Sequence, residues 1–114
     1  MAWELFTIDQ YDVYSVSANT DGYPGVYGFI TLYWAGQQRA RLWFYRDSVT
    51  TIPVNMSYNS GGHTNYYARF GQAQFRDSVD LLRNEKPVSF QWNETSKGAF
   101  LSTGAEPVGE AERP

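Results

Sequence analysis

The chain has 114 residues and no cysteine, and its 12 acidic residues outnumber its 9 lysines and arginines to give a net charge of −3. This length suits a single domain with a self-sufficient core, and the absence of cysteine excludes a disulfide framework and a thiolate nucleophile. The acidic balance disfavours non-specific nucleic-acid binding. Because no segment has the pattern of an export signal or a membrane span, we expect a cytoplasmic protein with no membrane partner.

The N-terminal third predicts strands. Two short strands are expected over residues 3–8 and 11–17, followed by a loop over residues 19–25 that is rich in Asn, Asp, Gly and Pro. Residues 26–45 then carry large apolar side chains at neighbouring positions around a central turn. They predict a long β-hairpin with aromatic residues on both faces.

The position of this turn decides which hairpin residues share a face. With a turn at Gly36-Gln37, one face contains Phe29, Thr31, Tyr33, Ala40, Leu42 and Phe44, and the other contains Ile30, Leu32, Trp34, Arg39, Arg41 and Trp43. A turn at Ala35-Gly36 would shift the pairs and keep the alternation within each strand. One face must belong to the core, and we place Phe29 and Phe44 there. The other face needs a cover, from the same chain, a second copy or a ligand.

The middle of the chain gives weaker signals. Residues 50–56 fit an edge strand limited by Pro53, and residues 58–64 have the composition of a mobile loop. Residues 66–70 fit a helix or a strand. Apolar residues at Phe75, Val79 and Leu82 predict a helix over about residues 72–84, which Pro87 prevents from continuing.

Two further strands complete the predicted fold. Residues 88–92 alternate, with Val88, Phe90 and Trp92 facing inwards, and residues 98–103 return after a turn. The sequence therefore predicts one α+β domain over residues 1–104, with a mostly antiparallel sheet of six or seven strands. We expect that sheet to be strongly curved or barrel-like, with one helix packed late in the chain. Residues 105–114 form an acidic tail that need not be ordered.

The second face of the hairpin is the main candidate site. It would present Trp34, Arg39, Arg41, Trp43 and Tyr45. Interleaved arginine and aromatic side chains can stack a sugar or a planar aromatic ligand, or seal a contact between subunits. Since large apolar patches usually mark protein interfaces, we expect a subunit contact centred on Trp43.

Catalysis has little support in the residues. His63 is the only histidine and follows Gly61 and Gly62, but no pattern supplies an orienting carboxylate and an oxyanion hole for it. A zinc site would need its other ligands from carboxylates alone. We therefore predict no catalytic residue, no metal site and no cofactor, and keep His63 as a low-ranking loop site.

Two C-terminal segments, residues 82–88 and 101–110, resemble segments of short bacterial proteins of unknown function. The resemblance implies a bacterial, cytoplasmic setting and no particular activity. The first functional hypothesis is a non-enzymatic domain that acts by association, as a homodimer through the aromatic hairpin face. The alternative is a small-ligand module for sugars or planar aromatics, and a hydrolase or isomerase that uses His63 or paired carboxylates ranks third.

Overall fold

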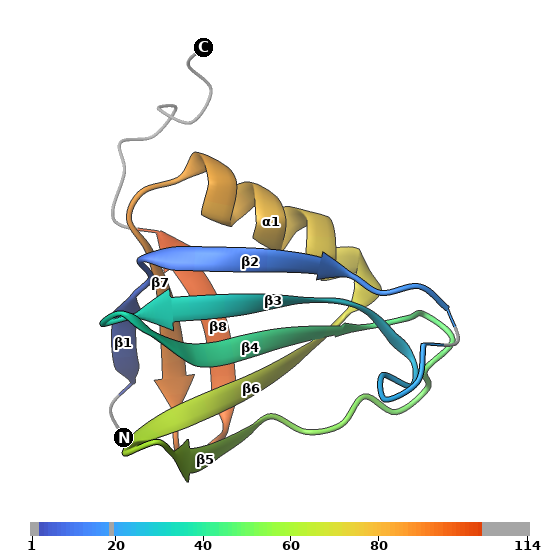
Figure 1. Cartoon of the computed structure of the whole chain (residues 1–114), viewed down its shortest axis with the longest axis horizontal. Coiled ribbons are helices and arrows are strands. Elements are labelled where there is room, and N and C mark those ends of the chain that lie inside the picture. Colours follow the sequence, from blue (N-terminus) through green and yellow to red (C-terminus); the bar gives the residue numbers. More distant parts are fainter. Residues whose placement is uncertain (1–2, 19, 104–114) are drawn as a thin grey trace.

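The computed structural model describes residues 3–18 and 20–103 (Figure 1). Within them the chain forms an α+β fold with eight strands in two sheets and one helical segment late in the chain. The elements are β1 (Glu4–Thr7), β2 (Gln10–Ser15), β3 (Val26–Trp34), β4 (Gln37–Tyr45), β5 (Met56–Ser60), β6 (His63–Gly71), a 3-10 turn (Gln72–Gln74), α1 (Phe75–Asn84), β7 (Val88–Asn93) and β8 (Gly98–Thr103). No helix in the described part of the chain is long and apolar enough to span a bilayer.

The larger sheet has the strand order β2-β3-β4-β6-β5, and the smaller has the order β1-β7-β8. All neighbouring strands are antiparallel except β4 and β6, which run in the same direction. The chain leaves the larger sheet after β4, makes the edge strand β5, and returns as β6 between β5 and β4. This return places β6, which is distant in sequence from β3, directly beside the hairpin.

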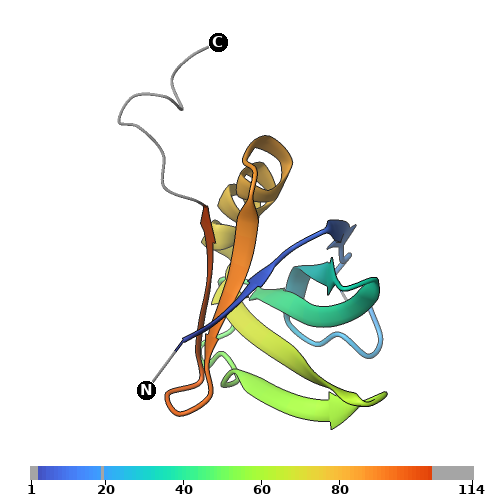
Figure 2. The same cartoon turned by 90° about the vertical axis from the view of Figure 1, so that its left-hand side faces the viewer.

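The core lies between the two sheets, which face each other with α1 at one end (Figures 1 and 2). The larger sheet contributes alternate residues of β3, β4 and β6, and the smaller sheet contributes Val88, Phe90 and Trp92 of β7. Leu82 of α1 completes this cluster. Phe90 and Trp92 are completely buried, as expected for the central strand of a sheet that is covered on this side.

The expectation of six or seven strands in a barrel-like sheet is wrong. The structure has eight strands in two open sheets, whose edge strands are β2 and β5 in one and β1 and β8 in the other. The additional strand comes from residues 56–60, because Gly61 and Gly62 adopt positive φ angles of 64° and 82° and form a tight turn. Residues 58–64, expected to be a loop, are therefore the tip of the β5–β6 hairpin, and residues 50–55 form no strand.

Several expected elements are confirmed. The 3-10 turn and α1 together cover residues 72–84, residues 66–70 are a strand, and β7 and β8 lie where alternation placed them. Val88, Phe90 and Trp92 face the core. The predicted acidic tail at 105–114 lies outside the described residues.

Candidate functional site

The β3–β4 hairpin turns at Ala35-Gly36, where both residues have positive φ angles, and Trp34 lies opposite Gln37. The pairing then shifts by one position between Tyr33, opposite Gln38, and Leu32, opposite Ala40. This bulge leaves Arg39 as an extra residue in β4. A shift of one residue exchanges the two faces of a strand relative to its neighbour. The prediction that Phe29 shares a face with Phe44, and Trp34 with Trp43, is therefore wrong.

The predicted site is consequently divided between the two sides of the sheet. Trp34 belongs to the core, where its ring stacks on Phe6 at 4.8 Å and on Phe90 at 5.8 Å between centroids. Arg39 lies over Trp34 with 6.0 Å from its Cζ to the ring centroid. Tyr45 is buried at the end of β4. Of the expected group, Arg41 and Trp43 lie on the side turned away from the core, which we call the outer face, and Tyr45 follows the core residue Phe44 on that same side.

An aromatic row crosses all five strands of the outer face. It consists of Tyr14 on β2, Phe29 on β3, Trp43 on β4, Tyr67 on β6 and Tyr58 on β5. Successive ring centroids are 4.4, 5.0, 5.6 and 5.2 Å apart. Phe29, expected in the core, is thus the buried centre of the opposite face. The row depends on the parallel β4–β6 pairing, which no local pattern in the sequence indicates.

Part of this row is covered by the chain itself. Tyr23, from the loop between β2 and β3, stacks on Phe29 at 5.7 Å and reaches Trp43 at 5.9 Å. Phe29 therefore stacks with both Tyr14 and Tyr23, at interplanar angles of only 16° and 10°. Rings stacked in this way have their faces occupied, so they leave little flat surface on which a planar ligand could stack.

Arg41 lies at the centre of the outer face. Its Cζ is 4.7 Å from the Phe29 centroid and 5.2 Å from the Trp43 centroid, and its guanidinium has no ion pair or hydrogen bond with any described residue. Thr31, which is 1 % exposed, pairs with Arg41 across the strands, and its Oγ1 also lacks a partner, as does Trp43 Nε1. Near the Arg41 guanidinium, the outer face thus contains polar groups that have no hydrogen-bond partner among the described residues.

Three further polar side chains of this face have partners. Tyr33 Oη donates a hydrogen bond of 2.7 Å to Asp12 Oδ2, and this bond raises the pKa of Tyr33. A hydrogen bond with Tyr67, followed by burial, raises the pKa of Tyr58. Arg69 lies over Tyr67 at 5.5 Å and donates to the carbonyl oxygen of Val54. Among the described residues, Arg41 therefore differs from Arg69, the other arginine on this face, because its guanidinium donates no hydrogen bond.

The low-ranking loop site has a different location. His63 is the first residue of β6, immediately after the Gly61-Gly62 turn, and it pairs with Ser60. Within residues 3–18 and 20–103, no group of three His, Asp or Glu side chains is arranged to share a metal ion. In these same ranges, no carboxylate forms an ion pair or a hydrogen bond with the His63 ring.

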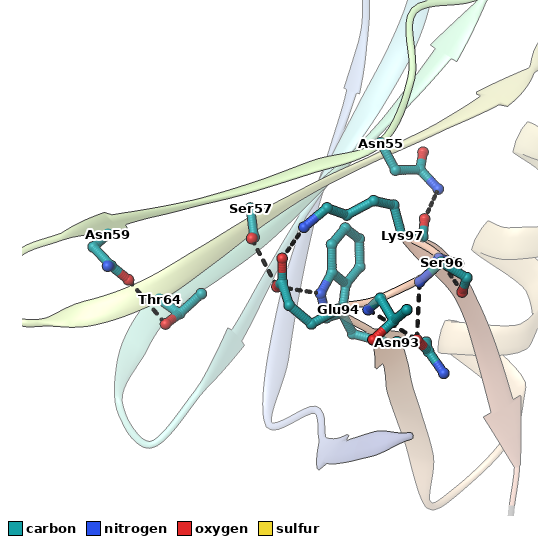
Figure 3. A network of polar contacts seen from close by, with 11 residues as sticks. Asn55, Ser57, Asn59, Thr64, Asn93, Glu94, Ser96 and Lys97 are labelled. Carbon is teal, nitrogen blue, oxygen red and sulfur yellow. Dashed lines mark hydrogen bonds and ion pairs between the residues drawn. The ribbon is translucent and has the colours of Figure 1, made fainter. Parts of the chain in front are cut away.

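A second polar cluster joins the two sheets and was not expected from the sequence. Glu94, in the turn between β7 and β8, accepts hydrogen bonds of 2.9 Å from Trp92 Nε1 and from Ser57 Oγ on β5, and it pairs with Lys97 (Figure 3). Asn55 Nδ2 donates to the Lys97 carbonyl oxygen at 2.8 Å. Since the groups of this cluster bond to one another, we interpret it as a structural connection between the sheets.

Comparison of this chain with models of protein families, with curated proteins and with solved structures finds no match.

Proposed function

We propose that this protein acts by association rather than catalysis, and that the outer face, centred on Arg41 and Trp43, binds a partner that presents an anionic group. The observation that supports this proposal is the guanidinium of Arg41, held over two aromatic rings with no acidic partner in the part of the chain that the structure describes. An arginine supported by rings is already positioned, and its donors suit a carboxylate or phosphate.

The shape of the face favours a macromolecular partner over a small ligand. The aromatic rings of this face pack against one another across five strands, so a partner would mainly contact ring edges, Tyr14 and Arg41. These contacts are spread over a broad surface. Small planar ligands and sugars bind best where ring faces are free or where a concave site surrounds them. We therefore rank the small-ligand alternative second.

The test compares Arg41→Gln with Arg83→Gln, which removes the same charge from the exposed surface of α1. The probes are a glutamate-rich peptide, an oligomer of a uronic acid and a single-stranded oligothymidylate. Binding of each probe is measured by tryptophan fluorescence, and Trp43→Phe shows which part of the signal comes from Trp43. We expect one of these anionic classes to bind, with affinity reduced about tenfold or more by Arg41→Gln and unchanged by Arg83→Gln. Absence of binding by all three probes, or equal effects of the two variants, would contradict the proposal.

Self-association through the same face is the second candidate function. The half-buried aromatic row favours it, because a second copy would cover the exposed part of Tyr14 at one end of the row and of Met56, which pairs with Tyr67. Two identical faces stacked about a two-fold axis along β4 would, however, bring their Arg41 side chains together, and like charges oppose such a contact. The mass measurements described below for Trp43→Glu test this candidate.

A further inference from the structure

The smaller sheet has an exposed side that differs from the outer face in its chemistry. Across β1, β7 and β8, Leu5 lies opposite Gln91, and Gln91 lies opposite Phe100. These three residues alternate with the core residues Phe6, Phe90 and Leu101, so they point away from the larger sheet. In Figure 2, no described helix or strand lies beyond this side. We call it the neutral face.

Among the residues of β1, β7 and β8, no charged side chain lies on the neutral face. Glu4 is the only charged residue in the three strands, and it lies opposite Trp92, on the core side. The remaining positions on the neutral face hold small or uncharged residues, and Gln91 Nε2 is satisfied by a hydrogen bond of 2.8 Å to Ser102 Oγ. A solvent-facing sheet surface normally contains charges that keep it soluble and monomeric, whereas the centres of protein interfaces are depleted of them.

The same face exposes three large apolar side chains close together. Trp3 is 43 % exposed, Leu5 58 % and Phe100 41 %, and the Trp3 and Phe100 rings are 4.9 Å apart. Gly98 allows this arrangement, because a Cβ at that position would lie 2.8 Å from Trp3 Cη2. Since an aromatic side chain carries about 150–250 Å² of surface, the exposed part of this patch is roughly 300 Å², the size at which apolar patches begin to mark interfaces.

From these observations we infer that a second copy of this chain packs on the neutral face, sheet against sheet, to form a homodimer. A two-fold axis packs the neutral face of one copy against the same face of the other, so identical side chains come close together. Since the face has no charges, this contact involves no repulsion between like charges. The outer face, with Arg41 at its centre, lacks this property. The inferred dimer leaves the outer face free for the partner proposed above, and it does not depend on that proposal.

The size of the neutral face predicts how strong the dimer is. Because its three strands are only about 4.8 Å apart, the neutral face covers a smaller area than the roughly 800 Å² per partner of a tight interface. The dimer should therefore dissociate on dilution. We expect the wild-type mass to rise from monomer towards dimer between about 10 µM and about 1 mM, the range typical of small interfaces.

The experiment measures mass by sedimentation equilibrium at both ends of that range for the wild type, Leu5→Glu, Phe100→Glu and Trp43→Glu. Leu5 and Phe100 are exposed, so their variants should fold, and circular dichroism verifies this. We expect both neutral-face variants to remain monomeric at about 1 mM, while Trp43→Glu, the matched change on the outer face, dimerises like the wild type.

Three results would overturn the inference. They are a wild type that stays monomeric throughout the range, folded Leu5→Glu and Phe100→Glu proteins that still dimerise, and loss of the dimer in Trp43→Glu alone. The last result would support self-association through the outer face instead. The first two outcomes do not affect whether Arg41 binds an anionic partner, so the two proposals fail separately.

Discussion

At Gly28 on β3 the larger sheet lies close to Phe75 of α1. A Cβ added at this position would lie 2.7 Å from the Tyr14 carbonyl oxygen on β2 and 2.8 Å from Phe75 Cε1 on α1. One of these neighbours is backbone that is already paired within the sheet, and the other is a ring held by Tyr27 and Phe44. The packing of α1 on the sheet thus depends on the absence of a side chain at Gly28.

We predict that Gly28→Ala lowers the free energy of unfolding by about 1–3 kcal/mol, because Phe75 must move away from the sheet to accommodate the methyl group. Gly71→Ala is the matched control, since a Cβ there meets no atom within 4 Å. Urea unfolding midpoints of the two variants provide the measurement. Equal midpoints for Gly28→Ala and the wild type would show that the helix adjusts without cost.

At the scale of elements, the turn between β7 and β8 connects the smaller sheet to the edge of the larger one. Strand β5 pairs only with β6, and its other side meets this turn through Ser57 and Glu94. Glu94 also accepts the indole hydrogen of the buried Trp92. Its carboxylate therefore satisfies a buried donor and holds an edge strand at the same time.

We predict that Glu94→Ala lowers the free energy of unfolding by about 1–3 kcal/mol, because Trp92 Nε1 loses its acceptor in a buried position. Asp21→Ala removes an exposed carboxylate from a loop and should change stability much less. Hydrogen exchange at β5 would separate the two effects of Glu94. We expect faster exchange there in Glu94→Ala, and unchanged exchange together with an unchanged midpoint would refute the proposed connection.

At the scale of the whole molecule, Tyr66 on β6 lies where the two sheets pack against each other. It lies in the core against Trp34, Phe90 and Trp92. Burial, and then the nearby carboxylate of Glu4 on β1, raises the pKa of Tyr66 to about 12. In the unfolded chain a tyrosine has a pKa of about 10, so folding favours the protonated phenol.

The resulting pH dependence has a definite sign. Below about pH 10 the phenol is protonated in both states, and its contribution is fully present. Between about pH 10 and about pH 12 the unfolded chain releases the proton while the folded protein retains it, so stability falls as the pH rises. We predict that Tyr66→Phe reduces this alkaline loss by up to about 2 kcal/mol relative to the wild type. Urea titrations at pH 9 and at about pH 11.5 test this, and identical slopes for Tyr66→Phe and wild type would contradict it.

The sequence by itself determined those features that depend on neighbouring residues. Alternation along residues 88–92 reports which side chains face the core, and the spacing of Phe75, Val79 and Leu82 defines the buried side of a helix, since both patterns follow from local geometry. The same reasoning correctly separated odd from even positions within β3 and within β4. It could not detect the bulge at Arg39, because a bulge is stabilised by packing across the sheet.

Only the tertiary structure decided how these elements combine. The one-residue shift moved Trp34 into the core and Phe29 to the outer face, and the parallel β4–β6 pairing brought Tyr67 beside Trp43. The chemistry of both exposed faces follows from such pairings, including the alignment of Leu5, Gln91 and Phe100 across three strands. Residues that far apart in the chain meet because the whole molecule buries the most apolar surface in that arrangement, and local spacing contains no information about it.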